Sequence, residues 1–129
     1  MNIFNLLFGG SKTARRTVTQ VTEKNILFDW RSISILLSQK SPSSLKNALI
    51  TADKSLDNAL RDIVDGEVMG DRLKNAENMF DHELYNKIWE AHKVRNNLVH
   101  ESGYEPPHFV ITEAIQVLKT ALQSLGLRI

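Results

Sequence analysis

The sequence contains no cysteine, no long apolar segment and almost no excess of charge of either sign. The lack of cysteine excludes disulfide bonds, cysteine-ligated zinc and a cysteine nucleophile, and it favours a reducing compartment. No apolar run approaches the ~20 residues that a membrane-spanning helix needs. The N-terminus lacks both the basic start and the long apolar run of a signal peptide. We therefore expect a cytoplasmic protein.

The near-neutral net charge limits the kinds of partner that the chain is expected to bind. Lysine and arginine number 16 against 15 aspartates and glutamates, a formal net charge of +1, which is far from the basic excess of a protein that coats nucleic acid. An anionic partner would therefore have to meet a local cluster of cations.

The sequence also lacks a phosphate-binding glycine loop, a nucleophile elbow and a metalloprotease motif. We expect no cofactor and no metal.

The length of 129 residues and the 42% hydrophobic content suit a single globular domain. We divide the chain into a flexible N-terminal arm at residues 1–22 and a helical bundle domain at residues 23–129. The arm combines two adjacent glycines with three cations and has no acidic residue. It is either a disordered terminus or strap over the bundle, or an anchor whose apolar side chains enter a layer of anionic lipid headgroups.

From residue 23 onward, apolar residues recur at helical spacing. The first predicted helix carries Ile26, Trp30, Ile33 and Leu37 on one face. Ser41-Pro42 predicts the start of the second helix, with serine as the cap and proline at the first helical position. This helix is expected to end near Gly66. Its apolar face consists of Leu45, Leu49, Ala52, Leu56, Ala59 or Leu60, and Ile63.

Two helices are expected in the middle of the chain. Residues 71–80 predict a short helix with Asp71 as its N-cap. Asp81 is the expected N-cap of a longer helix that continues to about Glu101, and Gly103 closes that helix.

A last helix follows a pair of prolines. Pro106-Pro107 is expected to prevent a helix from restarting nearby, so Thr112 is the predicted N-cap. The apolar stripe of this helix is Ile115, Leu118, Leu122 and Leu125. No run of alternating apolar residues predicts a strand. The sequence therefore predicts an all-α fold, an antiparallel up-and-down bundle of four main helices and one short helix.

One side chain in the helix predicted over residues 82–101 contradicts that helix's own pattern. On a wheel of about 100° per residue, the apolar side chains fall within an arc of about 100°, and Arg95 lies near the middle of it. A guanidinium cannot escape burial by losing its proton, so it needs an anionic partner or an open cleft. A core carboxylate such as Asp29 or Asp53 could be that partner, and so could a phosphate.

A polar stripe adjoins the same apolar arc. Its members are Tyr85, Trp89, His92, Asn96 and His100. Arg95 and His100 are about 140° apart on an ideal helix, so they can meet on one ligand only at the helix end or across a dimer interface. Histidine transfers protons at neutral pH, and arginine presents paired donors to a phosphate. Such a set could cleave RNA, where the 2′-hydroxyl is the nucleophile and no metal is needed.

The segment Arg95-Asn96-Asn97-Leu98-Val99-His100 resembles the signature of HEPN domains, an arginine followed by a polar residue, several further residues and a histidine. These domains are helical bundles, and many are metal-independent RNA-cleaving toxins, defence nucleases or RNA-processing enzymes. Residues 89–94 and 101–103 also resemble the surroundings of that motif, and the resemblance is best over residues 69–126. It implies a homodimer in which the motifs of two protomers face each other, RNA as the substrate, and a protein partner such as an antitoxin.

Carried onto this sequence, the resemblance implies a role for three residues. Arg95 would contact the scissile phosphate, Asn96 would assist, and His100 would act as acid or base. The residues assigned to substrate binding are His92, Lys93 and Tyr104.

A non-catalytic reading accounts for the same residues. Arg95 would pair with a core carboxylate, and His100 would interact with the negative end of the helix dipole. The chain would then be a helical interaction module, held at a membrane or a partner through residues 1–22.

Overall fold

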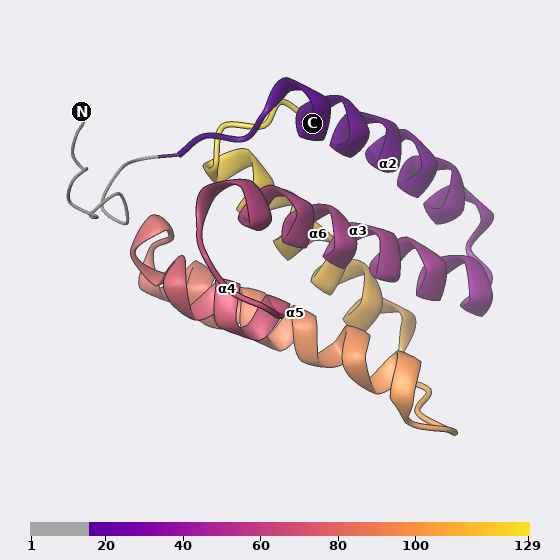
Figure 1. The fold of residues 1–129 in the computed structure, drawn as a ribbon. Coiled ribbons are helices and arrows are strands. Elements are labelled where there is room, and N and C mark those ends of the chain that lie inside the picture. Colours follow the sequence, from indigo (N-terminus) through magenta and orange to yellow (C-terminus); the bar gives the residue numbers. More distant parts are fainter. Residues whose placement is uncertain (1–15) are drawn as a thin grey trace, which may run out of the picture.

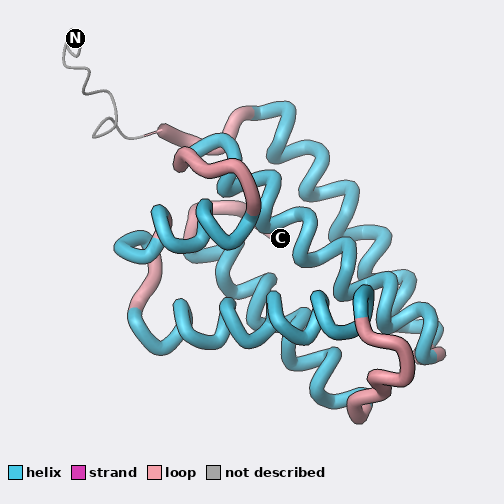
Figure 2. Tube along the Cα trace, turned by 60° about the horizontal axis from the view of Figure 1, so that its bottom comes forward, coloured by secondary structure: helices cyan, strands magenta, loops and turns pink. Residues whose placement is uncertain are grey.

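The computed structural model describes residues 16–129, and within this range every regular element is a helix. The elements are α2 (Gln20–Gln39), α3 (Pro42–Ile63), α4 (Met69–Asn75), the short 3-10 helix η2 (Glu77–Met79), α5 (His82–His100) and α6 (His108–Ser124). Consecutive long helices run in opposite directions (Figure 1). Short loops join α2 to α3 and α5 to α6, whereas α4 and η2 lie between α3 and α5 (Figure 2). The all-α fold class is therefore confirmed. None of the described helices has the length and apolar character needed to cross a membrane.

The helix α3 is the centre of the bundle, because α2, α4, α5 and α6 all pack against it. Its start is the predicted one. The hydroxyl of Ser41 accepts a hydrogen bond from the amide of Ser44 at 3.1 Å, and the hydroxyl of Ser44 accepts one from the amide of Ser41 at 3.0 Å. This capping box satisfies two backbone donors that the helix itself cannot pair. Every residue of the predicted apolar face is buried.

The helix α2 begins three residues earlier than its apolar pattern indicates. Thr19 is the N-cap and accepts a hydrogen bond from the amide of Thr22 at 3.2 Å. Asp62 of α3 accepts bonds from the amide and hydroxyl of Thr19 at 2.9 and 3.1 Å. Partial burial alone would raise the pKa of Asp62, but its hydrogen bonds from Thr19 and Thr22 outweigh burial and lower that pKa. Residues 20–22, assigned to the arm, therefore belong to α2, and residues 1–15 of the arm lie outside the described range.

The expected short helix over residues 71–80 is displaced. Helix α4 begins at Met69, and Asp71 lies in its first turn instead of capping it. Arg72 explains the position of α4. This side chain is only 6% exposed, and its Nε and Nη2 donate to the two carboxylate oxygens of Asp57 on α3 at 2.7 and 3.1 Å. The hydrogen bonds to Asp57 raise the pKa of Arg72, and burial opposes this rise.

The loop before α4 is held by the same arginine. Arg72 Nη1 donates to the carbonyl of Gly66 at 2.7 Å. Gly66 has a φ of +149°, and a Cβ at this position would lie 2.7 Å from Cγ of Arg72 and 2.9 Å from its backbone nitrogen. Only glycine fits such a close approach without displacement of the chain. The contact therefore fixes the loop between α3 and α4 as well as α4 itself.

The expectation that Pro106-Pro107 would delay the last helix is wrong. Pro107 is itself the N-cap of α6, with a φ of −56°, and its carbonyl accepts from the amide of Val110 at 3.0 Å. Proline is excluded from helix interiors but is compatible with a helix start, where the missing N–H is not needed. Thr112 lies inside the helix, and its hydroxyl donates to the carbonyl of Phe109 at 3.2 Å. It is not a cap.

Candidate functional site

Helix α5 has the boundaries that its capping residues predict. The carboxylate of Asp81 accepts from the amide of Leu84 at 2.9 Å, and the helix ends at His100. The chain then turns at Gly103, whose φ is +84°, a conformation that glycine adopts without steric cost. Arg95, Asn96 and His100 thus occupy the last two turns of a well-capped helix.

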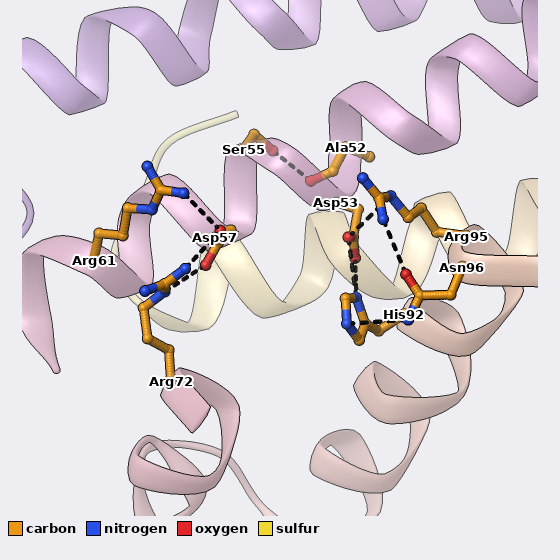
Figure 3. Close-up of polar contacts among 9 residues, drawn as sticks. All are labelled: Ala52, Asp53, Ser55, Asp57, Arg61, Arg72, His92, Arg95 and Asn96. Atoms are coloured by element: carbon orange, nitrogen blue, oxygen red, sulfur yellow. Dashed lines mark hydrogen bonds and ion pairs between the residues drawn. The ribbon is translucent and has the colours of Figure 1, made fainter. Parts of the chain in front are cut away.

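A buried carboxylate on α3 faces this helix. Asp53 is 3% exposed and lies on the apolar face of α3, four residues after Leu49 and three before Leu56. An isolated carboxylate is very unfavourable in such surroundings, so it must be paired and hydrogen-bonded. Its partners come from α5 (Figure 3).

His92 makes the closest of these contacts. Its Nδ1 lies 3.0 and 3.1 Å from the two carboxylate oxygens of Asp53. A carboxylate only accepts hydrogen bonds, so Nδ1 carries a proton and Nε2 is the free acceptor when the ring is neutral. The Nδ2 of Asn96 lies 3.5 Å from that Nε2. Only 12% of the His92 side chain is exposed.

Arg95 lies beside the same carboxylate but is not hydrogen-bonded to it. Its Nε is 3.7 Å from Asp53 Oδ2, buried, and without a hydrogen-bond partner among the described residues. Its Nη1 donates to Oδ1 of Asn96 at 2.9 Å, and 29% of the side chain remains exposed. The expected pairing with a core carboxylate is therefore found, and the partner is Asp53. The other candidate, Asp29, lies 3.5 Å from Nζ of Lys54.

The contacts form one directed series across the α3–α5 contact. Arg95 donates to Asn96, Asn96 faces the ring nitrogen of His92, and His92 donates to Asp53. Each group orients the next, so the guanidinium has a fixed position at the edge of the buried region. A partly exposed guanidinium of this kind can bind an anion, because its remaining N–H donors are aligned before the anion arrives.

The structure separates the other predicted site residues from this cluster. His100 is exposed at the end of α5, and within residues 16–129 its side chain makes no hydrogen bond or ion pair. Lys93 is exposed, and Tyr104 is half-buried in the loop between α5 and α6. Arg95, Asn96 and His92 are thus brought together, whereas His100, Lys93 and Tyr104 are not. Two grooves, one between α5 and α6 and one between α2 and α6, are lined by other residues.

The Asp53–His92 pair is the feature that sequence reasoning missed. The signal was present, since a carboxylate on the apolar face of α3 contradicts the pattern of that helix as Arg95 contradicts the pattern of α5. From the sequence, Asp53 is a candidate partner for Arg95 and His92 is assigned to substrate binding, and the two are not paired. The pairing joins residues 39 apart in the chain, and it depends on how α3 and α5 are rotated against each other.

Comparison of the chain with models of known families, with curated proteins and with solved structures gives no match. The HEPN resemblance therefore rests only on the sequence itself, on the segment Arg95–His100 and its surroundings.

Proposed function

We propose that this chain is an HEPN-like, metal-independent endoribonuclease in which Arg95 binds the scissile phosphate and His100 transfers protons. The observation that carries the proposal is the guanidinium of Arg95, which is aligned by Asp53 and Asn96 and remains partly open to solvent. A side chain that is charged at every accessible pH and held in this way is suited to an anionic substrate.

The chemistry assigns one task to each residue. The 2′-oxygen attacks phosphorus while the bond to the 5′-oxygen breaks, which yields a 2′,3′-cyclic phosphate and a 5′-hydroxyl. Arg95 stabilises the charge that develops on the phosphoryl oxygens. His100 takes the proton of the attacking hydroxyl or gives one to the leaving oxygen. Asn96, held between Arg95 and His92, keeps the guanidinium in place.

His92 acts from behind Asn96 in this proposal. It is largely buried and its two nitrogens face Asp53 and Asn96, so it is a positioning residue for the amide. Lys93 is exposed on the next position of α5, where it could contact the backbone of RNA. Tyr104 follows the end of α5 and could stack on a base.

The separation of Arg95 and His100 calls for two chains. They differ by about 140° around α5, so one protomer would supply the arginine and its partner the histidine of each site. We therefore include a homodimer in the proposal, with the ends of the two α5 helices facing each other. Its mass in solution can be measured by light scattering coupled to size exclusion.

The test is cleavage of a labelled RNA in excess chelator, with the ends of the products identified. We expect 2′,3′-cyclic phosphate ends, and a loss of at least 10²-fold in rate for His100→Ala and Arg95→Ala. The matched control is His82→Ala, because His82 is exposed and lies at the first residue of α5, the opposite end of the helix from His100. Full activity in His100→Ala would remove the assignment.

A second candidate function is supported by the contacts that connect α3 to α5. Asp53, His92, Asn96 and Arg95 form a connected set that joins α3 to α5, and such a set can serve the fold alone. In that case the chain is a non-catalytic interaction module. Arg95→Ala would then lower the melting temperature, and no variant would change the rate of RNA cleavage above background.

A further inference from the structure

The outer side of α2 carries a row of exposed apolar side chains. Val21, Phe28 and Ile35 are 70%, 66% and 61% exposed. They are seven residues apart, so at about 100° per residue they lie within about 40° of one another along the helix. Helix α2 is at the edge of the bundle and packs mainly on α3 (Figure 1). The row therefore points away from the rest of the described chain.

The charges beside this row are of one sign. Lys24 and Arg31 are exposed and lie within about 60° of the row, both on the same side of it. The two carboxylates of α2 point elsewhere. Glu23 and Asp29 lie about 100° or more from the row, and Asp29 is bound by Lys54 of α3. The face thus combines apolar side chains with cations and has no acidic residue.

We propose that this face of α2 docks on an anionic lipid surface. An amphipathic helix in that setting places its apolar row at the level of the acyl boundary and its cations among the headgroups. The long stems of Lys24 and Arg31 allow their charges to reach the headgroups while the row is immersed. The convex outer side of an edge helix fits a plane, whereas a partner helix would need a groove.

The sequence that precedes α2 has the same chemistry. Ile3, Phe4, Leu6, Leu7 and Phe8 are followed by Lys12 and Arg15, and no acidic residue occurs before Glu23. This segment joins the described chain at the end of α2 where Val21 lies.

Other occupants fit the face less well. A second copy of the chain, paired through α2, would bring four cations together without a carboxylate to compensate them. An RNA would leave the three apolar side chains in water. The experiment below distinguishes these two occupants from a lipid surface.

The test is co-sedimentation of the full chain with phosphatidylcholine vesicles that contain or lack phosphatidylglycerol. We expect binding to the anionic vesicles, and a loss of at least tenfold in affinity for the double variant Phe28→Ser/Ile35→Ser. Phe109→Ser is the matched control, because Phe109 on α6 is 62% exposed and lies off this face. The variant Lys24→Gln/Arg31→Gln should lose about 25-fold on anionic vesicles, at about fivefold per cation. Lys46→Gln, an exposed lysine of α3, should lose nothing.

Several results would overturn the proposal. The proposal is wrong if the parent chain does not bind anionic vesicles. It is also wrong if the variant Phe28→Ser/Ile35→Ser binds them as tightly as the parent chain does. A concentration-dependent dimer that this double variant abolishes would assign the face to a second copy. RNA retention that depends on Lys24 and Arg31 would assign it to nucleic acid. A lower melting temperature in the double variant, absent from Phe109→Ser, would mean that the chain covers the face itself. The assay is independent of RNA cleavage, so the ribonuclease proposal can fail without affecting it.

Discussion

Replacement of Asp53 by asparagine tests the order of contacts in the cluster, because it removes the charge and keeps the shape. The bond from His92 to a buried carboxylate is expected to contribute about 1.5–3 kcal/mol. The contact with Arg95 is weaker, since its Nε lies 3.7 Å away and is not hydrogen-bonded. We expect Asp53→Asn to lower the free energy of unfolding by about 2–4 kcal/mol.

Double-mutant cycles separate the two partners of Asp53. The single variants His92→Leu and Arg95→Gln and their combinations with Asp53→Asn are unfolded in urea, with circular dichroism as the signal. The coupling energy with His92 should be about 1.5–3 kcal/mol and should exceed the coupling with Arg95. Asp29→Asn is the control, and it should cost less than 1 kcal/mol because its partner Lys54 is mostly exposed. A larger coupling with Arg95 would refute the order of contacts described above.

Two further predictions concern the contacts that place α2 and α4 on α3. Arg72→Met should lower the free energy of unfolding by about 3 kcal/mol, which is at the lower end of the range for a broken buried pair, because Arg61 stays 3.4 Å from Asp57. Urea unfolding measures this loss. The control variant is Arg61→Met, which should cost less than 1 kcal/mol. Asp62→Asn tests the lowered pKa of Asp62. Since the folded pKa lies below the unfolded value of about 3.9, the stabilisation is present above that pH and is lost as pH falls through the folded pKa. The difference in melting temperature between parent and Asp62→Asn should therefore be constant near neutrality and vanish in acid, and a difference that persists in acid would contradict the assignment.

Local chemistry predicted much of the fold. Ser41-Pro42 and Asp81 fixed the starts of α3 and α5, because each satisfies backbone donors through its own side chain and needs no distant partner. The wrong predictions concern the starts of α4 and α6, which are set by a tertiary contact and by a position that tolerates proline. Arg72 holds α4 through Asp57, and Pro107 accepts the role of N-cap that Thr112 was expected to have. Neither outcome follows from periodicity.

The candidate site was predictable to the extent that one helix determines it. The wheel of α5 identified Arg95 as a cation on an apolar face, and the need for a partner led to Asp53 as one of two candidates. The pairing of Asp53 with His92 and the isolation of His100 depend on the relative rotation of two helices. A single sequence does not contain that rotation, so His92 was expected to contact substrate instead of the core.

The unsatisfied Nε of Arg95 is a cost in stability that either of the two functions considered above has to account for. A buried donor without an acceptor costs about 1–3 kcal/mol, and a buried ionic cluster is often no more stabilising than apolar side chains of similar volume. A contact between α3 and α5 that served stability alone would be expected to satisfy every donor or to contain none. Arg95 instead turns one nitrogen to a carboxylate 3.7 Å away and leaves part of its guanidinium in solvent. Because Nε is buried, an anion could reach only the exposed end of the guanidinium, and it is this exposed end that supports the ribonuclease proposal.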